Sequence, residues 1–163
     1  MIGIHENDTL AAVFLNQGEI YCTATPTVIS TVLGSCISVC LWDGRRGIGG
    51  MNHYVLPEAK NRARSLRYGD VAVAALVQKM IDLGSVPEDI DAKIFGGASA
   101  IPSQSPAVGD GNIRVAMDVL EKAGISVAAR STGGHGGCVI HFHTISGEVL
   151  VRRLPPMAVA VAE

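Results

Sequence analysis

The chain has 163 residues, of which 48% are hydrophobic and 17% are charged, and its formal net charge at pH 7 is −2. This length and apolar content suffice to bury the core of one domain, so we expect a single globular domain over residues 1–163 and exclude a disordered chain. A charge balance so close to neutral offers no basic surface for nucleic acid, so we expect no nucleic-acid partner.

Two further features bear on the compartment. The sequence has no apolar run near the roughly 20 residues that span a bilayer, and its first eight residues lack the basic and apolar regions of a signal peptide. We therefore expect a cytoplasmic protein without membrane insertion. The four cysteines follow no disulfide-framework spacing, which favours reduced thiols. They are Cys22, Cys36, Cys40 and Cys138.

Nine short strands are predicted along the chain. Apolar or alternating runs of this length, bounded by glycine, asparagine or proline, are typical of strands. The strands expected before the first helix are 10–15, 19–24, 28–33, 37–42 and 48–56, and those expected after it are 92–95, 125–130, 138–144 and 149–154.

Two helices are predicted between these strands. Apolar residues at helical spacing from Val73 to Leu83 indicate the first helix, with Asp70 as its N-cap and Gly84 just past its end. Asn112 is expected to cap the second helix, which Gly124 ends. Many short strands, mostly in hairpins, with only two helices favour an α/β (α+β) fold. We expect a layered sandwich of mixed, largely antiparallel sheets covered by two main helices.

One predicted hairpin brings a cysteine next to a histidine. Cys36 opens the strand that enters the turn at 43–47, and His53 lies on the returning strand. A turn centred between Gly44 and Arg45 places the two residues directly opposite, with β-carbons roughly 4.5 to 5.5 Å apart. A turn centred on Asp43 and Gly44 shifts the register by two and makes them diagonal neighbours on the same face. An odd-length loop or a bulge would put them on opposite faces.

This pair predicts nucleophilic catalysis. A thiol is nucleophilic as the thiolate, and a neighbouring imidazole can take its proton. The tight turn Leu33-Gly34-Ser35-Cys36 also leaves backbone amides near the sulfur, where they could bind an oxyanion. The implied reaction is acyl transfer from an amide, ester or thioester, with Gly34 and Ser35 against the substrate. The alternative is a buried core cysteine and a structural strand histidine.

A second group of residues has types that suit zinc, although its spacing matches no standard zinc site. Its members are His135, Cys138, His141 and His143. Exposed strand histidines are the simpler interpretation, so we expect no metal.

With these residues in view, the chain resembles the CheD family, the chemoreceptor glutamine deamidases of bacterial chemotaxis. The most specific segments are 31–36, 40–43 and 49–57, which read TVLGSC, CLWD and GGMNHYVLP. The resemblance implies a layered α/β fold and a hydrolase that converts receptor glutamine side chains to glutamate and releases ammonia, without a metal or organic cofactor. It implies that Cys36 is the nucleophile and His53 its base.

The family's third catalytic residue is a threonine hydroxyl that aligns with Ser30. A shift of one residue would substitute Thr31, and only one of the two can face His53 because neighbouring strand residues point to opposite faces. The resemblance also implies two partners, the methyl-accepting chemotaxis receptors and a CheC-type phosphatase. A catalytically idle regulator that only binds these partners is the alternative, but mere docking needs neither the thiol nor the imidazole.

A basic segment follows the hairpin. It contains Lys60, Arg62, Arg64 and Arg67. Its simplest interpretation is a solvated loop. A further hypothesis is that it attracts the glutamate-rich receptor electrostatically.

Overall fold

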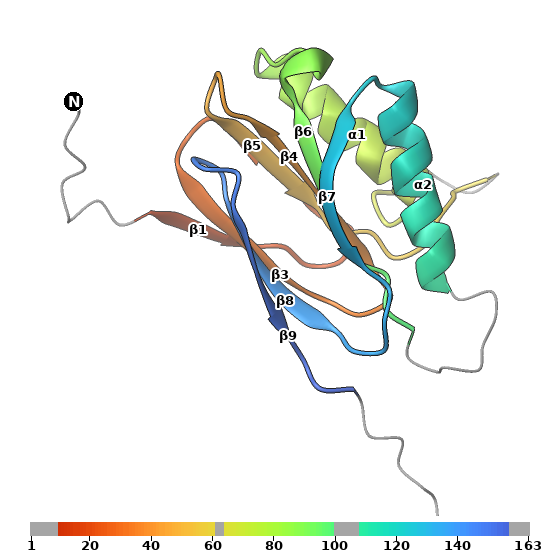
Figure 1. Cartoon of the computed structure of the whole chain (residues 1–163). Coiled ribbons are helices and arrows are strands. Elements are labelled where there is room, and N and C mark those ends of the chain that lie inside the picture. Colours follow the sequence, from red (N-terminus) through yellow and green to blue (C-terminus); the bar gives the residue numbers. More distant parts are fainter. Residues whose placement is uncertain (1–9, 61–63, 100–107, 157–163) are drawn as a thin grey trace, which may run out of the picture.

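The structure is a computed structural model that describes residues 10–60, 64–99 and 108–156. These residues form two sheets and two helices in three layers, with the helices on the five-stranded sheet and the four-stranded sheet on its other side (Figure 1). The expected layered α+β fold is therefore confirmed. No helix among these residues is long and apolar enough to cross a membrane.

The two sheets contain all nine predicted strands, with ends that differ from the prediction by a few residues at most. In spatial order, the four-stranded sheet consists of β1 (Ala11–Phe14), β3 (Thr27–Leu33), β8 (Cys138–His143) and β9 (Val149–Arg153). In the same way, the five-stranded sheet consists of β2 (Ile20–Thr23), β5 (Ile48–Asn52), β4 (Ile37–Asp43), β6 (Asp91–Gly96) and β7 (Ser126–Thr132). Only the β1–β3 and β6–β7 pairs are parallel, so the sheets are mixed and largely antiparallel.

Fewer strands form hairpins than expected. Within the described chain, consecutive strands pair antiparallel only in β4–β5 and β8–β9. The segment 15–19 does not close a hairpin, because it leads from β1 in one sheet to β2 in the other. This crossing puts residues 16–18 at the junction of the two sheets.

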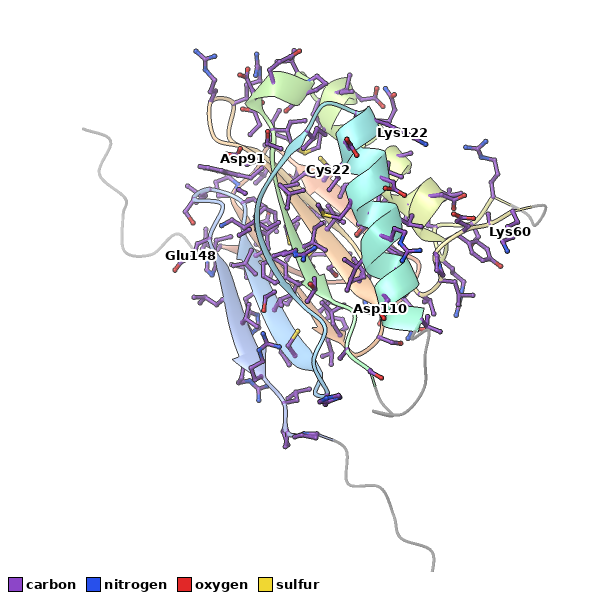
Figure 2. All side chains as sticks on the ribbon, turned by 45° about the vertical axis from the view of Figure 1, so that its right-hand side comes forward. Cys22, Lys60, Asp91, Asp110, Lys122 and Glu148 are labelled. Atoms are coloured by element: carbon purple, nitrogen blue, oxygen red, sulfur yellow. The ribbon has the colours of Figure 1, made fainter. Side chains whose placement is uncertain are left out.

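The helices cover one face of the five-stranded sheet. They are α1 (Gly69–Asp82) and α2 (Val108–Lys122), and a short 3₁₀ helix, η1 (Pro87–Asp89), precedes β6. The first core lies between the helices and this sheet, and it contains Val39, Leu41, Leu76 and Leu120. Figure 2 shows Asp110 near the start of α2 and Lys122 near its end, where each charge complements the helix dipole.

The helix starts differ from the predicted ones, whereas the ends agree. The N-cap of α1 is Tyr68, and Asp70 lies in its first turn, where its carboxylate accepts hydrogen bonds from the amides of Ala59 and Val71. Asn112 is not a cap, because α2 begins at Val108. Gly84 follows the end of α1 with φ +112°, a conformation that favours glycine.

A second core fills the space between the two sheets. Cys36, Cys40 and Met51 contribute to it from the five-stranded sheet, and Ile29 and Phe142 from the four-stranded sheet. Because β4 lies between the two cores, nearly all its side chains are buried. The side chains of residues 37, 39 and 41 face the helices, and those of residues 38 and 40 face the other sheet. This explains why apolar residues occupy both faces of the strand.

Asp43 fixes the turn between β4 and β5. Its buried carboxylate accepts hydrogen bonds from the Arg45 and Arg46 amides at 3.0 and 3.1 Å, from the Arg46 guanidinium at 3.0 Å and from the Ser85 hydroxyl at 2.7 Å. Burial alone would raise the pKa of Asp43, but the hydrogen bonds from Ser85 and Arg46 bring it below its ordinary value. The four-residue loop 44–47 is thereby held in one conformation, and it pairs Asp43 with Ile48.

We expect Asp43→Ala to lower the free energy of unfolding by about 2 to 4 kcal/mol, because it leaves buried donors without their acceptor. Urea denaturation followed by circular dichroism measures this change. Since the pKa of Asp43 is depressed in the folded state, its stabilisation is present above about pH 4 and is lost as the pH falls through the folded value, so the difference from wild type should shrink in acid.

Asp82→Ala is the matched control, because this exposed carboxylate on α1 accepts only a surface hydrogen bond from Gln78. Its effect should stay within about 0.5 kcal/mol. An Asp43→Ala protein as stable as the Asp82→Ala protein would show that the carboxylate does not hold the turn.

Candidate active site

The register of β4 and β5 brings Cys36 and His53 to the same face. Cys40 pairs with Met51, and beyond the end of β5 the pairing continues as a bridge between Ile37 and Tyr54. This register places His53 opposite Ser38, two residues along the strand from Cys36. Cys36 and His53 are therefore diagonal neighbours and do not lie directly opposite. The turn is centred between Arg45 and Arg46, so the register is shifted by two in the opposite direction from the one expected for a turn on Asp43 and Gly44. The loop has an even number of residues, so both side chains point between the sheets.

The third member of the site comes from the opposite sheet. Thr31 is fully buried on the inner face of β3, and its Oγ1 lies 2.7 Å from Nδ1 of His53. The same hydroxyl donates its proton to the carbonyl oxygen of Leu15 at 2.8 Å. Oγ1 is thus an acceptor toward His53, which assigns the ring proton to Nδ1.

This tautomer leaves Nε2 of His53 as the ring atom with a free lone pair. Nε2 is buried, and it has no hydrogen-bond partner among the described residues. It is therefore available to exchange a proton with the thiol of Cys36 on the same face. A hydroxyl bonded to one nitrogen of an imidazole, with a thiol on the same face, supplies the types of group that make up a catalytic triad.

Ser30 does not contact His53. It lies on the outer face of β3, where its Oγ is 2.6 Å from Nδ1 of His141 on β8. Of the two hydroxyls considered for the third residue, Thr31 therefore contacts His53 and Ser30 does not. The physical reason is strand alternation, because Ile29, Thr31 and Leu33 face the inner core and the residues between them face outward.

The chain around the cysteine is fixed through its carbonyl groups. The carbonyl oxygen of Gly34 accepts a hydrogen bond from the Ala98 amide at 2.9 Å. That of Ser35 accepts one from Nδ2 of Asn112 at 3.0 Å, and that of Cys36 accepts one from the Gly97 amide at 3.0 Å. Within the described part of the chain, the amide of Ser35 donates no backbone hydrogen bond, and the amide of Cys36 acts only on its own sulfur. Both amides therefore lie beside the sulfur as donors for an oxyanion.

Gly96 must be glycine at its position next to the cysteine. Its φ is +104°, and a β-carbon built on it would lie 2.1 Å from the carbonyl oxygen of Cys36. Gly96 therefore permits a close approach of two backbones at the end of β6.

Asn112 is a residue of the site that the sequence interpretation missed. It is fully buried on α2, and its Nδ2 bridges the carbonyl oxygens of Ser35 and Val55 at 3.0 and 2.9 Å. The main-chain carbonyl oxygen of Asn112 accepts a hydrogen bond from the hydroxyl of Tyr54. An amide among the buried residues of an amphipathic helix was the available signal, because a buried polar side chain needs a partner.

The site is neutral at rest. The side chain of Cys36 is nearly buried, at 7% exposure, and burial raises the pKa of its thiol above the ordinary value, although its own backbone amide and the charge of Arg67 act to lower it. Burial likewise lowers the pKa of His53, which Glu19 opposes. A thiol and a neutral imidazole, and not a thiolate with an imidazolium, are therefore the resting forms at neutral pH.

The basic segment lies beside this site in part. Arg67 is exposed and close enough to Cys36 for its charge to act on the thiol. Lys60 and Arg64 are also exposed, and Figure 2 shows Lys60 on the side of the molecule away from the four-stranded sheet. Arg62 lies outside the described residues.

The residues considered for zinc do not converge. Cys138 is buried between the sheets, whereas His141 and His143 lie on the outer face of the same strand. No group of three or more potential metal ligands occurs in residues 10–60, 64–99 and 108–156.

A thiol and an imidazole are groups that hydrolases with a cysteine nucleophile use. The family model described as CheD chemotactic sensory transduction matches residues 55–153. The chain is 48% identical to a probable chemoreceptor glutamine deamidase CheD of Rhodospirillum rubrum over 86% of this chain and 81% of that protein. It is 43% identical to a probable chemoreceptor glutamine deamidase CheD 1 of Anaeromyxobacter dehalogenans, over 88% of this chain and 85% of that protein. The chain belongs to the CheD family.

Two solved structures are similar at a lower level. The hypothetical protein YfiH of Bacillus licheniformis has a TM-score of 0.49 at 18% identity, covering 69% of this chain and 49% of that one. A protein of Neisseria meningitidis has a TM-score of 0.43 at 14% identity, and the match covers 77% of this chain and 63% of that one.

Alkylation of Cys36 tests the neutral resting state. We expect the rate of its reaction with iodoacetamide to rise with pH and to reach its midpoint above the roughly 8.5 of a free thiol. Peptide mapping separates Cys36 from the other three cysteines. Arg67→Ala should move the midpoint further upward, because a positive charge that favours the thiolate is removed. A midpoint near or below pH 7 would instead indicate a thiolate–imidazolium pair at rest.

Proposed function

We propose that this protein is a chemoreceptor glutamine deamidase that converts glutamine side chains of methyl-accepting chemotaxis receptors to glutamate in the cytoplasm. One observation carries the proposal: the Thr31–His53 hydrogen bond leaves a buried imidazole nitrogen without a partner on the face that holds the Cys36 thiol. The names of the CheD relatives supply the substrate class, a receptor glutamine.

The first half-reaction forms a thioester. Nε2 of His53 takes the proton of the Cys36 thiol while Sγ bonds to the amide carbon of the substrate glutamine. The electron pair of the carbonyl moves to oxygen, and the amides of Ser35 and Cys36 donate hydrogen bonds to this oxyanion. When the carbonyl reforms, the carbon–nitrogen bond breaks. The imidazolium gives its proton to the leaving nitrogen, and ammonia departs.

The second half-reaction restores the enzyme. His53 takes a proton from water as the water oxygen bonds to the thioester carbon, and the same amides hold the second oxyanion. The carbon–sulfur bond then breaks, Sγ recovers a proton from the imidazolium, and glutamate is released. Glutamine and water thus become glutamate and ammonia, and no step needs a metal or an organic cofactor.

Two features support the proposed partners. Arg67 is exposed and close to Cys36, where its positive charge attracts a glutamate-rich receptor surface. A CheC-type phosphatase is the second proposed partner, and it rests on the family resemblance alone.

Cys36→Ala tests the catalytic proposal against a regulator that acts only by contact. Wild-type protein should convert glutamine to glutamate in a receptor cytoplasmic fragment, each event adding the mass difference between amide and acid and releasing one ammonia. The variant should have no activity, because only the thiol can form the thioester. Peptide mass spectrometry measures the conversion. Conversion by both proteins would exclude Cys36 as the nucleophile, and binding without conversion by either would favour the regulator.

Thr31→Val and Ser30→Ala form a matched pair that tests the third residue. Thr31→Val keeps the shape of the side chain but removes the acceptor for Nδ1 of His53, so we expect kcat to fall on the order of 10²-fold. Ser30→Ala removes a hydroxyl that contacts only His141 on the outer face and should change kcat less than about threefold. Thr31→Ser should retain most of the activity. Equal losses in Thr31→Val and Ser30→Ala would contradict the assignment.

A further inference from the structure

The side chain of Gln17 reaches the reactive sulfur from the loop between β1 and β2. Its amide Nε2 lies 3.9 Å from Sγ of Cys36, within the range of a hydrogen bond to sulfur. Nothing in the proposed mechanism so far uses this contact. We propose that Gln17 is a catalytic residue whose side-chain amide donates a hydrogen bond to the oxyanion, together with the backbone amides of Ser35 and Cys36.

The loop that carries Gln17 is fixed to the base of the site. The Gly18 amide donates to the carbonyl oxygen of His53 at 2.8 Å, and the His53 amide donates to that of Glu19 at 3.1 Å. Gly18 has φ +79°, and a β-carbon on it would lie 3.0 Å from Cγ of Arg67. These bonds at residues 18 and 19, directly after Gln17, hold the loop in register with the imidazole.

The chemistry favours a donor to the oxyanion over other roles. In the tetrahedral adduct, the oxyanion and Sγ are attached to the same carbon. The side-chain amide of Gln17 lies next to Sγ, so it is also near the new negative charge. At rest the thiol carries no charge for the amide to stabilise. A hydrogen bond that gains strength only as charge develops lowers the barrier to reaction and leaves substrate binding unchanged.

This inference rests on the proposed deamidase activity, and it is tested with the same receptor fragment. Gln17→Met keeps the length of the side chain and removes the donor. Gln78→Met makes the same change on the exposed surface of α1, where Gln78 bonds only Asp82. We expect Gln17→Met to lower kcat by about 10²-fold, the usual loss for one oxyanion donor, with KM and the pH midpoint of Cys36 alkylation unchanged. Gln78→Met should retain the wild-type rate.

Four results would overturn the inference. The first is an unchanged kcat in Gln17→Met, and the second is a loss of kcat/KM that comes only from a higher KM. The third is a lower kcat together with an upward shift of the alkylation midpoint, which would make Gln17 a partner of the thiolate. The fourth is Cys36-dependent conversion of Gln17 to glutamate in the wild-type protein, which would make Gln17 a substrate of its own site. Circular dichroism confirms that the variants are folded. A wild-type protein without activity would overturn the proposed function as well, so the two failures are distinguishable.

Discussion

The hydrogen bond between Thr31 and His53 is the interaction on which the site depends, because it joins the two sheets through their shared core. Thr31 belongs to the four-stranded sheet, whereas His53 and Cys36 belong to the five-stranded sheet. The site therefore exists only when the sheets are packed on each other. Polar side chains buried among apolar ones are costly unless they are paired. The threonine hydroxyl meets this need by donating to Leu15 and accepting from the imidazole.

The second requirement is the register of one hairpin. A slip of a single residue would turn either Cys36 or His53 to the helix side of the sheet. Asp43 prevents this slip by closing the four-residue turn with a buried carboxylate. The same strand begins directly after Cys36, whose carbonyl oxygen accepts a hydrogen bond from the Gly97 amide, and Asn112 from α2 holds the carbonyl oxygen of Ser35. Thus the turn at one end and the helix at the other fix where the thiol lies.

Much of this arrangement follows from the sequence because it depends on local patterns. Strand periodicity identified all nine strands, and the even loop kept Cys36 and His53 on one face. The unpredicted parts depend on contacts between distant segments. The orientation of Thr31 follows from which face of β3 packs on the other sheet, and the role of Asn112 follows from how α2 crosses the loop at Ser35. A buried amide on a helix signals that Asn112 needs a partner, but no local pattern shows which partner it has or which way Thr31 points.

The hydroxyl of Thr31 also explains why the site can lie in an apolar interior. A carboxylate beside His53 would favour the imidazolium, but it would place a permanent charge between the sheets, and such a charge is stable there only when it is well paired. A hydroxyl orients the ring without adding charge. Thiol, imidazole and hydroxyl are then all neutral before substrate binds, as the directions of the Cys36 and His53 pKa shifts indicate. Charge separation is confined to the reaction itself, where amide donors around the sulfur have their largest effect.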